Sequence, residues 1–372
     1  MPLSKLNVLE FAGVLAGPSV GMFLAEAGAE VLKIEPPETG DVTRSWRLKT
    51  EQAFEQNSRS SYFNSINWGK QSRVMNLKAA ENRPELQKLV RAADIALLSF
   101  KPGDAGKLGL TYEELNAWNP GLIYASVSGY GPQDERLAYD ALLQAESGFM
   151  HLNRTPEAPP GKMPVALIDV LAAHHLKELL LLALIQKMKT GKGAHVEVSL
   201  FEVAVSSLAN QASSWLSAGA DPQPMGNEHP HIFPYGGSFS TADGREIVLA
   251  VGSDAQFARL CAALGDAALS QDARFARNAD RSARRETLRP KLAALFARIP
   301  EAVSFLETLH KQNVPAALIR RVSEAVQYYE TRFFAHRAAQ GLRGLPQLCG
   351  RINGKPAARP LSAPPALKTS PD

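Results

Sequence analysis

The sequence predicts an α/β protein with a parallel sheet, and three observations lead to this prediction. The chain has 372 residues, 45% of them hydrophobic, which allows a large core and is too long for one ordinary domain. Apolar runs of strand length alternate with segments of helical periodicity through the first half of the chain. Strands that alternate with helices are typical of parallel sheets, because each helix carries the chain back across the sheet.

The opening of the chain predicts a β-α-β unit. Residues 7–12 form a short apolar run, residues 18–29 have helical spacing with Pro18 at the entrance, and residues 30–35 are strand-like. The same alternation predicts strands over 72–77, 95–100 and 122–128, and helices over 84–93 and 112–118. The turn after the first strand lacks G-x-G-x-x-G, so NAD binding is not predicted.

A long apolar helix is predicted over residues 170–189, followed by a strand over 195–200. Gly191 supplies the stop signal of this helix. Asp169 is therefore expected at the helix N-terminus, where aspartate is a common structural cap. Beyond Ala220 the composition shifts to Pro, Gly and Asn, and residues 238–251 predict a hairpin. We expect a smaller domain over 221–315.

Charge and cysteine content narrow the function classes. The net charge is +4, but lysines and arginines are scattered among acidic residues, so no nucleic-acid partner is predicted and an anionic small ligand explains the excess. Cys261 and Cys349 have neither a disulfide framework nor metal-ligand spacing, so we expect no metal and a reducing, cytoplasmic location. The most apolar stretch, residues 179–185, is far too short for a membrane span.

Several short motifs follow one another in a specific order. They are Leu15-Ala16-Gly17-Pro18, Lys33-Ile34-Glu35-Pro36, Gly40-Asp41 with Arg44, Gly69-Lys70, Phe100-Lys101-Pro102-Gly103, Ser128-Gly129-Tyr130-Gly131, Tyr139-Asp140 and Gly226-Asn227. Through these motifs the chain resembles the class III CoA-transferase (CaiB/BaiF) family over about residues 5–320.

The resemblance implies a fold and a set of partners. It implies a large Rossmann-like domain built from both chain ends, residues 1–220 and 316–372, the second part including a C-terminal tail. It also implies a smaller α+β domain and an interlocked homodimer. The implied substrates are an acyl-CoA and a small carboxylic acid, with no tightly bound cofactor.

The resemblance places a catalytic nucleophile at Asp169. A carboxylate suits attack on a thioester because its acyl derivative, an anhydride, is as energy-rich as the thioester. The helix N-terminus offers backbone N–H groups to the carboxylate, so we expect its pKa to lie below the reference of about 3.9. Asp169 would then be ionised at pH 7.

The other implied site residues contact CoA or line the acyl pocket. The CoA phosphates require cations, and flat rings can pack against the adenine or the pantetheine arm. The implied CoA contacts are Arg44, Lys70, Ser99, Phe100, Lys101, Lys107 and Tyr139. The implied acyl pocket consists of Leu15, Asp140 and Gln144. Taken singly, the same residues could be solvated surface charges or core side chains.

Two alternatives remain open at this point. One is an α-methylacyl-CoA racemase or related isomerase on the same scaffold, in which Asp169 and Asp254 could serve as acid and base. Against it, racemases of the family carry a histidine-aspartate pair where this chain has Tyr139-Asp140. The other is a non-catalytic CoA-binding protein, which the substituted positions Leu15 and Ser99 would favour.

Overall fold

The computed structural model describes residues 1–51 and 59–367, and the chain divides into two compact units. Unit 1 comprises residues 1–149, 162–220 and 332 onward, and unit 2 comprises residues 150–161 and 221–331. The expected boundaries differ in two places. Residues 150–161 belong to unit 2, and unit 2 ends at residue 331 instead of 315, because residues 316–318 pair with the hairpin of unit 2.

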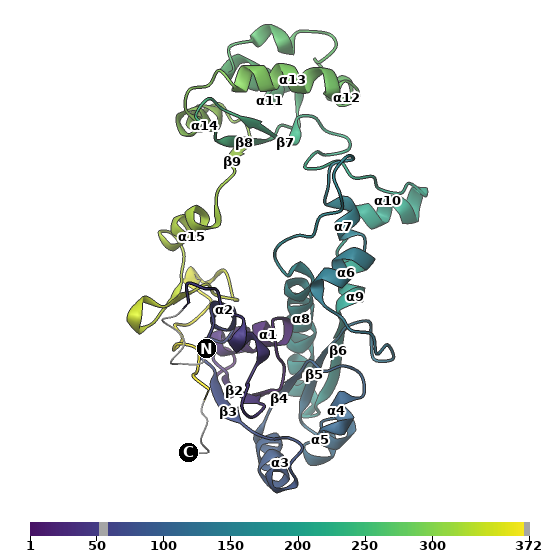
Figure 1. Ribbon diagram of the computed structural model, residues 1–372, viewed down its shortest axis with the longest axis vertical. Helices are drawn as coiled ribbons and strands as arrows, with labels where there is room; N and C mark the ends of the chain where they lie inside the picture. Colours follow the sequence, from purple (N-terminus) through teal and green to yellow (C-terminus); the bar gives the residue numbers. More distant parts are fainter. Residues whose placement is uncertain (52–58, 368–372) are drawn as a thin grey trace. The chain divides into compact units, whose positions relative to one another are not determined.

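Unit 1 is built on one parallel sheet of order β3-β2-β1-β4-β5-β6 (Figure 1). Its strands are β1 (Asn7–Glu10), β2 (Glu30–Glu35), β3 (Gln71–Val74), β4 (Ile95–Leu98), β5 (Ile123–Ser128) and β6 (Ala194–Ser199). All neighbouring strands run parallel. The order reverses between β1 and β4, and open α/β sheets bind their ligands at such a reversal, beyond the carboxyl ends of the strands.

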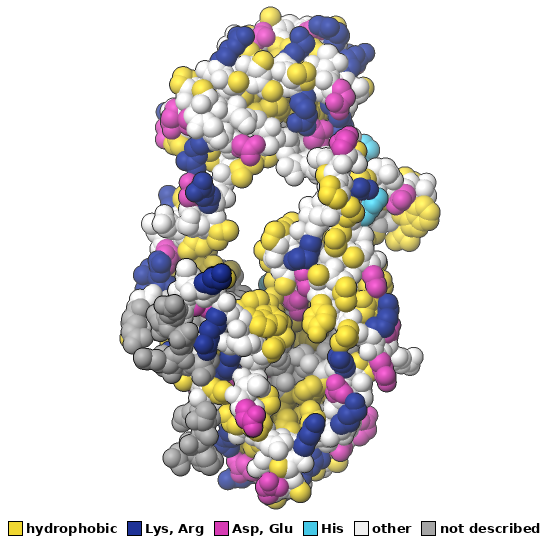
Figure 2. Space-filling model, viewed as in Figure 1, with side chains coloured by type: hydrophobic (Ala, Val, Ile, Leu, Met, Phe, Trp, Pro, Cys, Tyr) yellow, Lys and Arg dark blue, Asp and Glu magenta, His cyan; other side chains and the backbone are white. Residues whose placement is uncertain are grey.

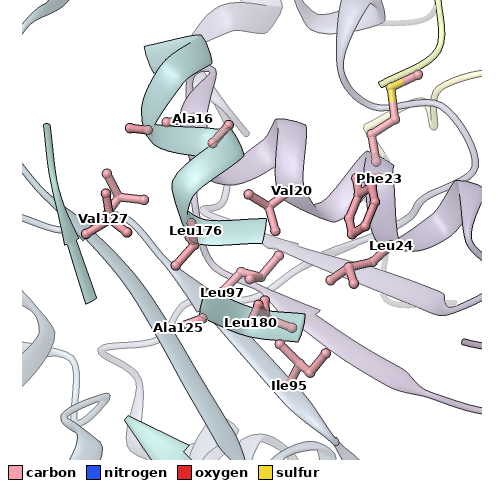
Figure 3. Close-up of a cluster of buried hydrophobic side chains, with 14 of the residues drawn as sticks. Ala16, Val20, Phe23, Leu24, Ile95, Leu97, Ala125, Val127, Leu176 and Leu180 are labelled. Atoms are coloured by element: carbon pink, nitrogen blue, oxygen red, sulfur yellow. The ribbon is translucent and has the colours of Figure 1, made fainter. Parts of the chain in front are cut away.

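Helices cover both faces of this sheet. Helices α1 (Ala16–Glu26) and α8 (Leu167–Thr190) pack side by side on one face, and α3 (Arg83–Ala92) and α5 (Tyr112–Trp118) pack on the other. Figure 3 shows Leu176 and Leu180 of α8 beside Leu97 and Ala125 of the sheet. These side chains are fully or almost fully buried, and each of the three leucines contributes about 1.5–3 kcal/mol by leaving water.

Shorter elements complete unit 1. Its other helices are η1 (Val42–Ser45), α2 (Ser61–Ser65), η3 (Ala80–Asn82), α4 (Asp104–Lys107), α6 (Asp140–Glu146), α9 (Leu200–Ser206), α10 (Asn210–Ala218) and η5 (Ala339–Gly341), and α7 (Phe149–Leu152) lies at the unit boundary. Its small antiparallel pairs are β10 (His336–Arg337) with β11 (Arg343–Gly344), and β12 (Arg351–Ile352) with β13 (Lys355–Pro356).

The C-terminal segment is tied to the end of α1 by one buried carboxylate. Glu26 accepts hydrogen bonds from the backbone N–H groups of Gln347 and Leu348, at 3.0 and 2.6 Å, and lies 2.7 Å from Nε2 of His336. These contacts bridge more than 300 residues of sequence. They account for the return of the chain to unit 1, which the resemblance implied.

Unit 2 has its own antiparallel sheet and its own core. Strands β7 (Tyr235–Ser240), β8 (Glu246–Ala250) and β9 (Ala316–Leu318) pair in sequence order, and the first two form the predicted hairpin. Its helices are α11 (Asp254–Ala263), η4 (Ala267–Ser270), α12 (Asn278–Ala283), α13 (Arg285–Phe296), α14 (Ala302–Lys311) and α15 (Val322–Glu330). Phe239 stacks on Phe296 at 4.9 Å within this core.

Candidate active site

A cavity of about 200 Å³ in unit 1 lies beyond the carboxyl ends of β1, β4 and β5. Its floor comes from the loops after these strands, which contribute Gly13 to Ala16, Ser99 to Pro102 and Val127 to Gly129, with Leu15 not among the lining residues. The remaining wall is formed by the segment from Arg136 to Asp140, together with Asp169 and Leu200. The cavity is therefore located where the sheet order reverses.

Asp169 lies in this cavity, in the first turn of α8. Its pKa is raised to about 6, chiefly by burial and also by the negative charge of Asp140, while a hydrogen bond from the backbone N–H of Ala16 opposes both effects. The expected lowering of the pKa was therefore wrong, because desolvation outweighs the helix N-terminus. At pH 7 a carboxyl group with this pKa is still mostly ionised.

The cap of α8 also differs from the expectation. The N-cap residue is Ala166, and Asp169 is the third residue of the helix. The side chain of Asp140 supplies the cap from another element, since its Oδ1 accepts a hydrogen bond from the N–H of Ile168 at 3.0 Å. Asp169 is thus free of the capping role and faces the cavity.

Asp140 and Gln144 form a second polar layer. The Asp140 carboxylate lines the cavity and accepts a hydrogen bond from Nε2 of Gln144 at 2.7 Å, while Lys162 lies 3.7 Å away. Gln144 is fully buried, and its Oε1 accepts a hydrogen bond from the N–H of Met163. Gln144 therefore fixes Asp140 and residue 163, and it does not line the cavity as the acyl-pocket expectation implied.

Tyr62 was missed by the sequence reasoning. It lies on α2 and packs edge-on against Trp46 at 5.0 Å between ring centroids. Burial raises the pKa of its hydroxyl, and the charges of Asp169 and Asp140 raise it further. Both carboxylates are therefore close enough to act on the phenol. No local pattern could reveal this, because Tyr62 and Asp169 are more than 100 residues apart.

The Phe100–Gly103 loop holds part of the expected CoA set. Ser99, Phe100 and Lys101 line the cavity, and Ser99 Oγ accepts a hydrogen bond from the N–H of Gly13 at 3.1 Å. Tyr139 also lines the cavity and is 62% exposed.

Lysine side chains gather beside this loop, around Asp104. The pKa of Asp104 is lowered by its hydrogen bond with Lys107, and the charges of Lys101 and Lys78 lower it as well. Lys78 was not named from the sequence. Of these three lysines, Lys101 lines the cavity.

Arg44 and Lys70 do not belong to this group. Lys70 is 3% exposed, and its ammonium is bonded to Glu10, to the carbonyl of Pro18 and to Oδ1 of Asn67. An ammonium has three N–H donors, and all three are used here. Lys70 is therefore not available to a phosphate, contrary to the expectation.

Arg44 is similarly occupied within the fold. It is buried, and its Nε and Nη2 each bond a carboxylate oxygen of Glu35 at 2.7 Å. The nearby Lys33 is buried between Glu10 and Asp41, at 3.0 and 2.9 Å. The Lys-Ile-Glu and Gly-Asp motifs thus build a buried ion network that holds the loops after β1 and β2, and Arg44 does not reach the cavity.

Two further features of the cavity wall were missed. Val14 has a left-handed backbone with φ +66°, a strained conformation for a β-branched residue and one found preferentially at functional sites. Arg136 packs over the ring of Tyr130 at 3.8 Å and forms ion pairs with Asp134 and Glu146. Both residues line the cavity.

A second cavity of about 260 Å³ adjoins the first and shares Phe100, Lys101, Pro102, Val127 and Ser128 with it. Its far wall carries the packed rings of Tyr112, Tyr124 and His195. Within residues 1–51 and 59–367, no group of three or more His, Cys, Asp or Glu side chains could hold a metal ion. Over the same ranges, no helix is both long enough and apolar enough to cross a membrane.

Comparisons with known proteins show the family of this chain. A family model described as CoA-transferase family III matches residues 3–367. A succinate–glutarate CoA-transferase of Agrobacterium fabrum is 41% identical over 292 residues, which are 77% of this chain and 72% of the relative. An acetyl-CoA:oxalate CoA-transferase of Acetobacter aceti is 36% identical over 318 residues, 84% of this chain and 79% of the relative.

A solved structure extends the agreement to the fold. The crystal structure of a CaiB/BaiF family protein from Brucella suis has a TM-score of 0.88 and 36% sequence identity, and the match covers 99% of this chain and 97% of that chain. Because the family model spans nearly the whole chain and relatives above 30% identity support it, the protein belongs to CoA-transferase family III.

Proposed function

We propose that the protein transfers CoA from an acyl-CoA to a small carboxylic acid, with Asp169 as the nucleophile. The observation that carries the proposal is the partly buried carboxylate of Asp169, mostly ionised at pH 7, in the wall of a cavity where the parallel sheet reverses its order. The named relatives transfer CoA to succinate, glutarate or oxalate. We propose an acceptor of this size, a small mono- or dicarboxylic acid.

The proposed reaction conserves the energy of the thioester. The Asp169 carboxylate attacks the thioester carbonyl and the carbon–sulfur bond breaks. CoA departs as the thiolate, and an acyl anhydride remains on Asp169. The thiolate then attacks the carboxyl carbon of Asp169 and releases the donor acid as a carboxylate. An acceptor carboxylate attacks the resulting aspartyl thioester and expels CoA thiolate, which gives an anhydride between Asp169 and the acceptor. The thiolate then attacks the acyl carbon of the acceptor, and this step yields the new acyl-CoA and free Asp169.

The surroundings of Asp169 support this chemistry. Partial desolvation makes a carboxylate more basic, and a more basic carboxylate is the better nucleophile. The N–H of Ala16 stands at the start of α1, where backbone donors stabilise negative charge that develops on an attacked carboxyl oxygen. Asp140 is fixed by Gln144 and Ile168, so its charge acts on Asp169 from a defined position.

For the CoA phosphates we propose the lysines around Asp104. Lys107 pairs with Asp104 at 2.7 Å, and the charges of Lys101 and Lys78 also lower the pKa of this carboxyl group. A phosphate can replace Asp104 as their counter-ion through charge-assisted bonds. The ring of Phe100, in the cavity wall, is the proposed contact of the pantetheine arm or adenine.

We further propose that the protein acts as an interlocked homodimer in the cytoplasm. Helix α8 leaves Leu182, Ile185 and Met188 exposed, the last at 86%, on a side turned away from the sheet. Apolar side chains also gather over α10, where Trp215 and Leu216 are exposed (Figure 2). Patches of this kind mark protein interfaces, and a second copy of the chain is the proposed partner. Sedimentation at micromolar concentration should give a dimer, and a monomer would contradict this proposal.

Trapping of the acylated aspartate tests the nucleophile. With a good acyl-CoA donor, hydroxylamine should convert Asp169 to a hydroxamate, which peptide mass spectrometry would locate. Asp140 is the internal control, because it lies in the same cavity and should remain unmodified. An adduct on Asp140 alone, or none on either residue, would remove Asp169 from its role.

The racemase alternative makes a different prediction. A racemase exchanges the α-proton of the acyl group with solvent and needs no acceptor acid. Asp254, its second candidate group, is engaged by Arg281 at 2.7 Å within unit 2. We expect transfer between acids without α-proton exchange, and exchange in deuterated water without transfer would favour the racemase.

A further inference from the structure

Ser128 carries a buried hydroxyl that has no partner among the described residues. It is the last residue of β5 and is 7% exposed, and its Oγ is inaccessible and makes no hydrogen bond. Ser128 also lies in the wall that the two cavities share. Ser128 thus borders both cavities, and a rotation about its Cα–Cβ bond would present the covered hydroxyl to a ligand in either of them.

The unpaired hydroxyl stands out against other buried serines of unit 1. Ser19 donates to the carbonyl of Leu15, and the Oγ of Ser147 donates to the carbonyl of Leu143. Most buried polar side-chain atoms find such a partner, because leaving one unpaired costs about 1–3 kcal/mol. Both serines bond the carbonyl four residues earlier in a helix, a partner that a strand residue does not have, and Ser128, in the wall of a cavity, is held without any partner in the described part of the chain.

We propose that Ser128 binds the pantetheine arm of CoA by donating its hydroxyl hydrogen to an amide carbonyl of that arm. The inference rests on the proposed function, which places the thioester at Asp169 and the phosphates at the lysines around Asp104. The pantetheine arm is the part of CoA that connects these two places. Its main polar groups are amides, and an amide carbonyl is the acceptor that an unpaired hydroxyl requires.

The composition of the shared wall supports this assignment. Phe100, Pro102 and Val127 offer apolar surface to the methylene and methyl groups of the arm. Ser128 is the one neutral side-chain donor among the five shared residues, and Lys101 is the charged one. Ligand sites commonly combine apolar walls with a few polar groups that fix orientation.

The test compares CoA with a ligand that lacks the pantetheine arm. Calorimetry would measure the Kd of free CoA and of adenosine 3′,5′-bisphosphate for the wild type, Ser128→Ala and the control Ser147→Ala. We expect Ser128→Ala to weaken CoA binding about three- to ten-fold, the effect of one lost hydrogen bond, and to leave bisphosphate binding unchanged. Ser147→Ala should keep the wild-type Kd for CoA.

A stability measurement provides the second readout. Without ligand, Ser128→Ala should unfold at the same temperature as the wild type or a higher one, because it removes an unpaired buried group. Unchanged CoA affinity in Ser128→Ala, or an equal loss for both ligands, would overturn the proposal. A lower unfolding temperature of the free variant would assign the hydroxyl to the fold instead. If the wild type binds no CoA at all, the proposed function fails, and that result is distinct from these.

Discussion

Replacement of Asp169 by asparagine should stabilise the protein while it abolishes transfer. The pKa of Asp169 rises from an ordinary 3.8 to about 6, chiefly because burial disfavours the charged form. At neutral pH this difference costs the folded state about 3 kcal/mol. An asparagine carries no charge, and its side-chain oxygen can still accept the hydrogen bond from Ala16. We therefore expect Asp169→Asn to be more stable at pH 7 by about 2–3 kcal/mol.

The sign and the pH window follow from proton linkage. Between pH 3.8 and about 6 the folded state binds more protons at Asp169 than the unfolded state does, so stability falls as pH rises. Below about pH 4 the carboxyl is protonated in both states and costs nothing. The stability gap between variant and wild type should therefore open from pH 4 to pH 6 and stay constant above.

Urea unfolding at five pH values from 4 to 8, without ligand and at one protein concentration, measures this gap. The fixed concentration matters because a dimer's stability depends on it. Asp272→Asn in unit 2 is the matched control, since Arg274 lowers the pKa of Asp272 to about 2 and its replacement should not stabilise. The reasoning would be refuted if the difference in free energy of unfolding at pH 4 were as large as at pH 7. It would also be refuted if Asp169→Asn were less stable than the wild type at pH 7.

Three further predictions concern the site and the buried charges of the core. The kcat/KM of transfer should fall as pH drops through about 6. Asp140→Asn should move this fall to lower pH, because the charge of Asp140 helps to raise the pKa of Asp169. The pH profiles of kcat/KM for the wild type and for Asp140→Asn test this prediction. Lys70→Met should lower the free energy of unfolding by about 3 kcal/mol, the cost of leaving Glu10 without one buried partner. Its folded fraction should bind CoA normally in calorimetry, whereas Lys101→Ala with Lys107→Ala should bind CoA more weakly. Tyr62→Phe should lower kcat and leave the Kd of CoA unchanged in parallel kinetics and calorimetry, because the phenol lies within reach of the charges of Asp169 and Asp140.

Local patterns in the sequence were sufficient for the scaffold. The strand-like segment 30–35 is strand β2 and the periodic segment 112–118 is helix α5, residue for residue. Such agreement is expected where burial alternates with a fixed period, because the period depends only on neighbours along the chain. The order of the motifs similarly indicated the family, and the match of the family model confirmed it. The place of Asp169 at the start of a helix beside the sheet could also be predicted.

Charge pairing and desolvation were decided by tertiary structure alone. Lys70 looked like an exposed phosphate ligand, yet its ammonium forms a buried ion pair with Glu10, which lies 60 residues earlier in the sequence. Asp169 looked like a cap with a lowered pKa, yet Asp140 supplies the cap and burial raises the pKa. These outcomes depend on which groups from distant segments surround a side chain, and on how much water is left beside it. Neither quantity has a period along the chain, so the sequence by itself determined where the elements run and only the folded structure determined what the charges do.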